Sequence, residues 1–347
     1  MTVHRFGIVG LSWITSEPAP AGTHPVLGLA TPHTHLSGIV NLPDATVVAG
    51  CDISESARDL FLERWSGTWP EARVFHDFQE MLDAGGIDVV CVATPDNLHE
   101  PVVLAAASSG VKAIFCEKPM SVHTDEIDAM IAATEKHNVL VSVNHTRRWS
   151  PQYVAARESL RTGDIGDLVH IMAHLGGERA MLWRNHSHII DLLSYFADAN
   201  PIWAVGELEP GFEDYGIRYH GDGGRDASIE PGANAYVAYD NGVRASLSGM
   251  KRGTQMMSVE LIGTSGKILV SDRQAILSQV TDDGAVSRPI VPQGTMGGMQ
   301  AAIADLLTSL ENGTPTQSPP SEARKAVAII EAILHSQAAG NNRVSVS

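Results

Sequence analysis

The apolar run at residues 111–116 constrains the fold most, because it ends abruptly in the polar tripeptide Glu117-Lys118-Pro119. A short, predominantly apolar run is typical of a parallel strand that is buried on both faces. A second run, at residues 88–93, also ends in a proline-bearing polar turn, Thr-Pro-Asp-Asn-Leu-His at 94–99. Open α/β sheets bind ligands at the carboxyl ends of their strands. The two runs therefore predict a parallel sheet with a ligand site that includes Lys118.

Alternating strands and helices in the first half of the chain predict a Rossmann-type α/β domain. We expect strands at 3–9, 46–52, 73–75, 88–93, 112–116 and 139–143, and helices at 34–42, 55–66, 77–83, 98–109 and 123–137. After Pro151 the pattern changes to helices at 152–161, 186–197, 297–312 and 320–339 and to strands with period-two alternation. Loops are expected at 209–233 and 281–298. Because 347 residues exceed one usual core, we predict a dinucleotide-binding domain at 1–146 and, at 147–347, an α+β domain for substrate binding and oligomerisation with a large, mainly antiparallel sheet.

Two features of the first strands favour a dinucleotide site. The first strand runs into Gly10, and the second ends on Asp52, a carboxylate placed to accept hydrogen bonds from a ribose diol. Such a carboxylate repels a 2′-phosphate, so we expect NAD, although Arg58 on the next helix leaves NADP possible. Alternatively, Asp52 only caps the helix that begins near Ser54.

The first βα loop departs from the usual glycine pattern. No second glycine closely follows Gly10, and no helix is expected before Pro32, which indicates an insertion across residues 12–31. A loop longer than the usual length of about two to six residues would lie beside the cofactor or cover the substrate, unless it is a plain surface excursion.

Composition excludes some classes of protein. With 24 basic against 40 acidic residues, the formal charge of −16 would repel nucleic acids and anionic membranes. The start of the sequence has no hydrophobic signal region, so we expect a cytoplasmic protein. Its cysteines, Cys51, Cys91 and Cys116, fall in predicted strands and are interpreted as core residues.

Taken together, the motifs resemble those of the glucose-fructose oxidoreductase, inositol dehydrogenase and MocA (Gfo/Idh/MocA) family. The resemblance covers nearly the whole chain and includes the segments 7–10, 51–52, 93–99, 117–119, 147–151 and 188–191. It implies an NAD(P)-dependent oxidoreductase acting on a sugar, a cyclitol or a derivative. By position, it implies cofactor contacts for Gly7, Gly10, Asp52, Thr94, Pro95, Asn97, His99, Glu117 and Lys118.

The same resemblance implies that Lys118 lies near the nicotinamide and the reacting hydroxyl, and that His188 transfers a proton. The residue types suit alcohol oxidation, which needs a base that titrates near neutrality and a cation beside the developing alkoxide. Lys118 could instead be a surface lysine, and His186 could replace His188 if the helix starts later. Asp191, three residues after His188, either orients the ring or serves capping or domain packing.

Substrate contacts are expected from Lys118, Arg148, Arg184, Asn185 and His188. The family often has an aspartate four residues before this histidine, where Arg184 stands here, and an arginine could grip an anionic substrate group. Arg147, Arg148 and Trp149 could line the nicotinamide or the substrate, or one arginine could serve the domain junction. The pair His170 and His174 lies in a predicted strand, so no metal is expected.

Two rival functions use the same parts. One is a dinucleotide-binding sensor or regulatory protein, and the other is an NAD-using hydrolase or lyase that oxidises its sugar transiently.

The alternating segments at 235–239 and 259–262 would expose an apolar sheet face, so a homodimer or homotetramer is expected. The alternative is a monomer whose carboxyl-terminal helices cover that sheet.

Overall fold

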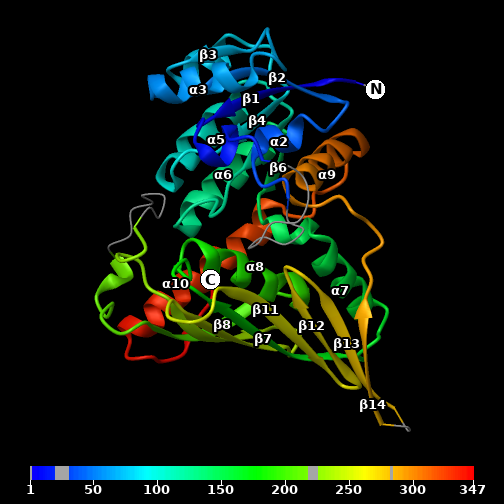
Figure 1. Ribbon diagram of the computed structural model, residues 1–347. Helices are drawn as coiled ribbons and strands as arrows, with labels where there is room; N and C mark the ends of the chain where they lie inside the picture. Colours follow the sequence, from blue (N-terminus) through cyan, green and yellow to red (C-terminus); the bar gives the residue numbers. More distant parts are fainter. Residues whose placement is uncertain (1, 20–30, 218–225, 282–283) are drawn as a thin grey trace. The chain divides into compact units, whose positions relative to one another are not determined.

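The computed structural model describes residues 2–19, 31–217, 226–281 and 284–347 (Figure 1). The chain divides into two compact units, of which the first contains 30–146 and the second 147–295 among their residues. One division between the units falls after Thr146, and residues 296–321 belong to the first unit. Most of the predicted insertion, residues 20–30, lies outside the described residues.

The described part of the first unit contains a six-stranded sheet in the order β3-β2-β1-β4-β5-β6. Its strands are β1 (His4–Val9), β2 (Ala45–Cys51), β3 (Arg73–Phe75), β4 (Val89–Val92), β5 (Ala113–Cys116) and β6 (Leu140–Val143). All neighbours are parallel, and β4 and β5 are completely buried. The predicted Rossmann-type sheet is therefore confirmed. Its strand order reverses between β1 and β4, which is where ligands bind in such sheets.

Helices of the first unit begin and end close to the predicted positions. They are α2 (His35–Ile39), α3 (Glu55–Trp65), α4 (Phe78–Asp83), α5 (His99–Ser108), α6 (Thr124–Lys136) and α9 (Gly298–Asn312). Side-chain caps fix two of the starts. The Ser54 hydroxyl accepts the Ala57 amide at the start of α3, and the Asp77 carboxylate accepts the Gln79 and Glu80 amides at the start of α4.

The expectation that no helix precedes Pro32 was wrong. A one-turn helix, α1 (Trp13–Ser16), follows the Gly10 turn directly. It is fixed by the Trp65 indole, whose Nε1 donates to the Ser16 carbonyl at 2.7 Å. The extra residues therefore lie between α1 and α2, at 17–34. A single turn has no apolar periodicity, and Pro18 follows it, so no helical signal could be read at these residues.

The described part of the second unit contains a nine-stranded sheet in the order β14-β13-β12-β11-β7-β10-β9-β8-β15. Its strands are β7 (Leu168–Gly176), β8 (Pro201–Leu208), β9 (Ala233–Tyr239), β10 (Arg244–Met250), β11 (Met256–Gly263), β12 (Gly266–Ser271), β13 (Ala275–Thr281), β14 (Gly284–Ile290) and β15 (Val344–Ser345). Among these pairs only β7 and β10 are parallel, so the prediction of a mainly antiparallel sheet is confirmed.

Helices α7 (Pro151–Arg161), α8 (Asn185–Ala197) and α10 (Pro320–Ala338) pack on this sheet. The 3-10 turn η3 (Tyr215–Ile217) lies in the loop after β8. On α10, the Ser336 hydroxyl accepts the Gly206 amide at 3.0 Å, and the Gln337 side chain accepts the Leu208 amide at 3.0 Å. These bonds hold the helix directly against β8.

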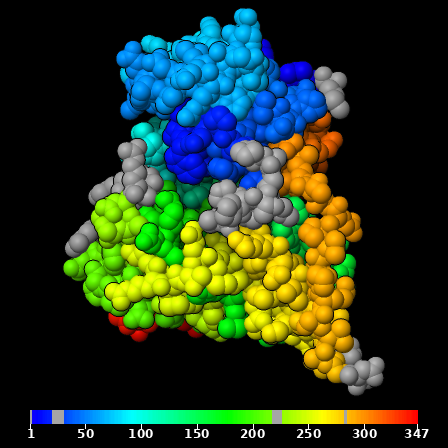
Figure 2. All heavy atoms as spheres, in the orientation of Figure 1, coloured from blue at the N-terminus to red at the C-terminus, as the bar shows by residue number. Residues whose placement is uncertain are grey.

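One face of the large sheet stays exposed in the described chain. Met172, Tyr236, Met250, Met256 and Leu269 share this face by strand register, and each is between 37% and 49% exposed. The region 281–298, predicted as a loop, contains β14 instead. This edge strand is exposed along most of its length and, with β13, forms a hairpin that projects from its unit (Figure 2).

The three cysteines are buried free thiols in β2, β4 and β5, as predicted. Burial raises the pKa of the Cys51 thiol to about 12, with the nearby Asp52 carboxylate contributing. None of the helices in the described residues combines the length and apolar character needed to cross a membrane.

Candidate functional site

The turn after β1 requires a glycine. Gly10 has a φ of +93°, and a Cβ there would lie 2.5 Å from the Ala93 carbonyl oxygen at the end of β4. Its amide donates to the Cys51 carbonyl at 2.8 Å, which ties the turn to β2. Three strand ends thus approach one another closely at Gly10, which is half-buried at the point where the sheet order reverses.

Asp52 holds this turn as well as the next one. Its Oδ2 accepts the Leu11 amide at 2.8 Å, and its Oδ1 accepts the Ser54 amide at 2.8 Å. The cap of α3 is the Ser54 hydroxyl, so capping is not the direct role of Asp52. Arg58 donates from Nη1 to the Asp52 carbonyl oxygen at 2.7 Å. The carboxylate is therefore fixed in orientation at the end of β2.

The glycine fingerprint is degenerate after Gly10. Ser12 precedes α1, and Thr15 lies in its only turn, at the spacing where a G-x-G-x-x-G motif has its second and third glycines. Thr15 is fully buried, and its hydroxyl donates to the Gly10 carbonyl at 2.7 Å. Gly7 lies inside β1, where an added Cβ would meet Ile87 at 2.8 Å, so the structure gives it a packing role.

The turn after β4 contains η1 (Asp96–Leu98) and leads into α5. Pro95 and Asn97 are exposed and Thr94 is half-buried, whereas His99 is fully buried. The His99 ring contacts the Thr94 carbonyl with Nε2 at 3.0 Å and the Pro119 carbonyl with Nδ1 at 3.0 Å. It thereby links the turn after β4 to the turn that carries Lys118.

Glu117 is the centre of a buried polar cluster at the end of β5. Its Oε1 contacts His35 Nε2 at 2.9 Å and accepts the Asn144 amide at 2.6 Å, and its Oε2 accepts the Lys118 backbone amide at 3.2 Å. Burial would raise the pKa of Glu117, but the hydrogen bond from His35 and the charges nearby lower it to about 2. Lys118 is half-buried, and its charge is among those that lower the pKa of Glu117.

In the second unit, α8 begins at Asn185, so His188 lies in its first turn and is half-buried. His186 is fully buried, with its Nε2 3.2 Å from the Ala233 carbonyl oxygen, and burial lowers its pKa to about 4. A Cβ at Gly249 would overlap the His186 ring, which lies directly on β10. His186 is therefore a packing residue, and the accessible histidine of α8 is His188.

Several charged residues predicted near the substrate have buried partners. Arg148, in η2 (Thr146–Trp149), donates to Asp191 at 2.8–3.0 Å and to Glu322 at 3.2 Å, with only 2% of its surface exposed. Asp191 therefore pairs with Arg148. Arg184 is buried, with its Nε 3.9 Å from the carboxylate of Glu230.

Arg147 has a similar partner. It makes two hydrogen bonds to Asp272, at 2.7 and 2.8 Å, and the Tyr153 hydroxyl donates to the same carboxylate at 3.0 Å. Both arginines of the 147–148 pair thus act within the second unit.

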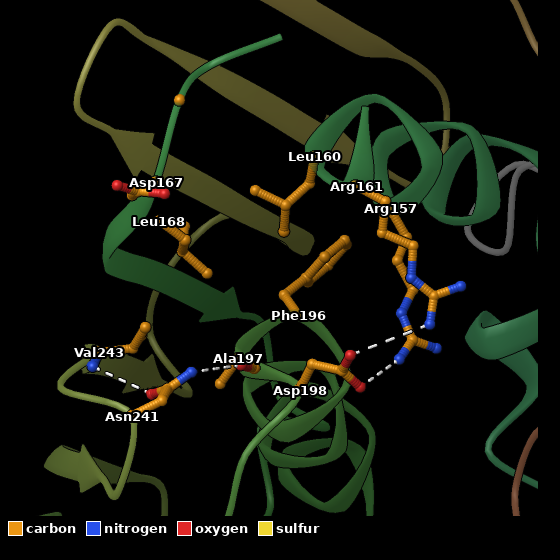
Figure 3. A pocket seen from close by; sticks show the side chains of 11 residues that line it. Arg157, Leu160, Arg161, Asp167, Leu168, Phe196, Ala197, Asp198, Asn241 and Val243 are labelled. Atoms are coloured by element: carbon orange, nitrogen blue, oxygen red, sulfur yellow. Dashed lines mark hydrogen bonds and ion pairs between the residues drawn. The ribbon is translucent and has the colours of Figure 1, made fainter. Parts of the chain in front are cut away.

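A hollow of about 510 Å³ lies elsewhere on the second unit (Figure 3). The guanidinium groups of Arg157 and Arg161 lie 2.8 and 4.0 Å from the Asp198 carboxylate in this hollow. Phe196 and Leu160 form an apolar part of its wall. None of the predicted site residues lines this hollow, so it is separate from the candidate site.

Sequence reasoning missed His35, Asn144 and Glu230. His35 lies 82 positions before its partner Glu117, so no local pattern connects the two residues. Asn144 follows β6 directly, so its place at the carboxyl edge of the sheet was the one available signal. Glu230 lies in a loop whose sequence has no periodic pattern.

These residues fit a dinucleotide. The absence of a Cβ at Gly10 leaves the strand ends open to close approach, and Asp52 presents an oriented carboxylate at the end of the adjacent strand. Lys118 and the 94–99 turn lie at the same carboxyl edge of the sheet. This arrangement matches the chemical needs of pyrophosphate and ribose, with Ser12 in place of the usual second glycine.

Comparison with known proteins agrees with this geometry. Residues 4–145 match the model of the Gfo/Idh/MocA family, described as an oxidoreductase family with an NAD-binding Rossmann fold. The chain is 26% identical to the scyllo-inositol 2-dehydrogenase (NAD(+)) of Bacillus subtilis, over 71% of this chain and 72% of that protein.

Other similarities differ in extent. The chain is 29% identical to the uncharacterized oxidoreductase YrbE of Bacillus subtilis, but spans only 37% of its length. A levoglucosan dehydrogenase solved with NADH and levoglucosan superposes with a TM-score of 0.79 at 17% identity, over 99% of this chain and 100% of that one. Residues 4–145 thus match the NAD-binding Rossmann fold of the Gfo/Idh/MocA family of oxidoreductases.

Proposed function

We propose that this protein is an NAD-dependent dehydrogenase that moves a hydride between the nicotinamide and a CH–OH carbon of a sugar or cyclitol. The observation that carries the proposal is the Lys118 turn, because it places a lysine at the carboxyl end of β5, directly after a buried, hydrogen-bonded carboxylate. Similarity to proteins named as inositol and levoglucosan dehydrogenases supports the substrate class.

The choice of NAD over NADP rests on Asp52. Its carboxylate is held by two backbone amides at the end of β2, where it would accept hydrogen bonds from a ribose diol and repel a 2′-phosphate. Arg58, the nearest candidate for binding a phosphate, already donates to the Asp52 carbonyl oxygen and lies 3.4 Å from His76.

The roles of the protein groups follow from alcohol oxidation. When bound, NAD would supply the hydride acceptor. We assign to Lys118 the stabilisation of negative charge on the reacting oxygen, which is a task for a fixed cation. Proton transfer is assigned to His188, because imidazole titrates near neutrality. Arg148 and Arg184 have carboxylate partners of their own, so we give them the task of holding the start of α8 and not of binding an anionic substrate.

A substrate panel tests the proposal. Inositol isomers, levoglucosan and common aldoses would be incubated with NAD or NADP, and NADH formation would be followed by absorbance. We expect turnover of at least one polyol with NAD. Consumption of a sugar without net NADH would point to transient oxidation in a hydrolase or lyase, whereas cofactor binding without any turnover would point to a sensor.

Cofactor choice is tested by Asp52→Asn. Asparagine can keep one amide contact through its oxygen but loses the charge that repels phosphate. We expect the affinity for NAD to fall and the affinity for NADP to fall less or to rise, as measured by titration calorimetry. Equal losses for both cofactors would leave Asp52 with only its role in the turn.

A further inference from the structure

Lys118 directly follows Glu117, which forms a buried polar cluster with the side chains of His35 and Asn144. Glu117 is 9% exposed, His35 is fully buried and Asn144 is 3% exposed. They come from β5, α2 and the end of β6, so three separate elements converge on one carboxylate. Burying a charge is costly unless hydrogen bonds compensate for it, and here three N–H groups contact the two oxygens.

His35 is placed by packing and has little freedom. It is the first residue of α2, a helix that is buried along its whole length. The Met299 amide at the start of α9 donates to the Pro32 carbonyl at 2.8 Å and fixes the approach to α2. The His35 ring also meets Phe115 of β5 edge to face at 5.4 Å. The donor to Glu117 is therefore preorganised.

We propose that Glu117 is a positioning residue for Lys118: its carboxylate, kept ionised by His35 and Asn144, favours the ammonium form of the lysine and fixes the turn that carries it. The proposal rests on the function assigned above, because Lys118 is the group on which Glu117 acts. The proposal explains why Lys118 carries the positive charge that is needed beside the reacting oxygen: a carboxylate of the same unit stabilises it.

The neighbouring titratable groups agree with this assignment. Opposite charges on Glu117 and Lys118 stabilise each other, and the lysine contributes to lowering the pKa of Glu117 after burial and His35 are counted. Burial, with the charge of Glu117 contributing, raises the pKa of the Cys91 and Cys116 thiols. These thiols are therefore neutral. Asp96 also contributes to the Cys116 shift, and His99 contacts the Pro119 carbonyl on the other side of the turn.

The test measures the charge of Lys118 without any substrate. The chain has six lysines, so reductive methylation with 13C-formaldehyde gives six dimethyl-lysine signals, and Lys118→Arg assigns one of them. Titration of the full-length protein by NMR then gives the midpoint for Lys118. In Glu117→Gln we expect this midpoint to fall by about one pH unit, since an opposite charge nearby shifts a pKa by roughly one to three units.

A matched control is Glu135→Gln, the same change at an exposed position of α6 in the same unit. It should leave the Lys118 midpoint unchanged. A Lys118 midpoint in folded Glu117→Gln that equals the wild-type value would overturn the proposal.

A second variant covers the case in which Glu117→Gln does not fold. Asn144→Asp replaces a donor 2.6 Å from Glu117 with a second carboxylate, and two such groups share one proton until the pH rises. The Lys118 signal should then show an additional inflection near neutral pH that the wild type lacks. Asn138→Asp, at an exposed turn, should show none. A Lys118 signal without the additional inflection in Asn144→Asp would also contradict the proposal.

The two proposals fail in different ways. If no polyol is oxidised but the lysine titrates as described, the dehydrogenase assignment falls and the electrostatic link remains. If turnover is found but the Lys118 midpoint is the same in Glu117→Gln as in wild type, only the link between Glu117 and Lys118 is refuted.

Discussion

The buried pair Arg148–Asp191 predicts a strong coupling energy within the second unit and unequal costs for the two single substitutions. Arg148 is 2% exposed and Asp191 is 1% exposed, and their hydrogen bonds measure 2.8–3.0 Å. Arg148 has a second carboxylate, Glu322, at 3.2 Å, and Glu322 in turn has Lys325 at 2.7 Å. The two single substitutions are therefore not equivalent.

The magnitudes follow from these partners. Removing one member of a buried pair costs about 3–5 kcal/mol, because the other charge remains buried. Asp191→Leu leaves Arg148 with Glu322, so we place its cost near about 3 kcal/mol, the lower end of that range. Arg148→Met takes the guanidinium away from a nearly inaccessible carboxylate, so its cost should approach about 5 kcal/mol. Replacing both by apolar residues can be nearly neutral, so the coupling, which is the difference between the double loss and the summed single losses, has a magnitude of up to about 8 kcal/mol.

Hydrogen exchange measured by mass spectrometry supplies the assay, because peptides from α8 report the free energy of opening of the helix that contains Asp191. The two single variants and the double variant complete the cycle. Additive losses, with a coupling below about 0.5 kcal/mol, would refute the pairing. If Arg148→Met shows a large rise in KM while hydrogen exchange in α8 is unchanged, Arg148 binds the substrate instead of stabilising the helix.

Three further predictions concern acid stability, the Gly10 turn and assembly. The pKa of folded Glu117, about 2, is depressed from its ordinary value of 4.5, so its contribution to stability is complete above pH 4.5 and is lost as the pH falls toward 2. His35→Leu removes the main favourable hydrogen bond, so acid unfolding followed by circular dichroism should begin at a higher pH than in wild type; an unchanged acid midpoint would contradict this. Gly10→Ala should destabilise the first unit by more than about 2 kcal/mol and weaken NAD binding, because the left-handed backbone costs about 1–2 kcal/mol and the Cβ also meets Ala93. Gly85→Ala, with a φ of +67° and nothing within 4 Å of the added Cβ, is the control, and equal losses in the two variants by urea titration would argue against the close contact. The exposed face of the large sheet predicts a homodimer or homotetramer by light scattering, whereas a mass near 37 kDa would establish a monomer.

Local patterns were enough to predict the parallel sheet and most helix positions. The run before Glu117 could be read because a strand buried on both faces needs uninterrupted apolar residues, and β5 indeed spans Ala113–Cys116. By contrast, β14 is an exposed edge strand that contains Pro289, so neither apolar alternation nor turn residues distinguished it from a loop.

Polar partnerships could not be predicted in the same way. Helical spacing allowed Asp191 either to orient His188 or to serve capping or domain packing, and it could not identify Arg148, 43 positions away, as the partner of this carboxylate. Likewise, nothing near Glu117 in the sequence identifies His35 as its partner. Such contacts arise when tertiary packing brings distant segments together, and a buried charge then takes whichever donor lies within reach. The sequence located the edge of the sheet where Lys118 lies but not the side chains that support it.

The most direct measurement of the central claim combines NAD binding with polyol turnover in Lys118→Ala. If the lysine stabilises the reacting oxygen, the rate should fall by at least about a hundredfold, equivalent to roughly 3 kcal/mol, while calorimetry gives nearly unchanged NAD affinity. Turnover at the wild-type rate in this variant, with NAD still bound, would contradict the account.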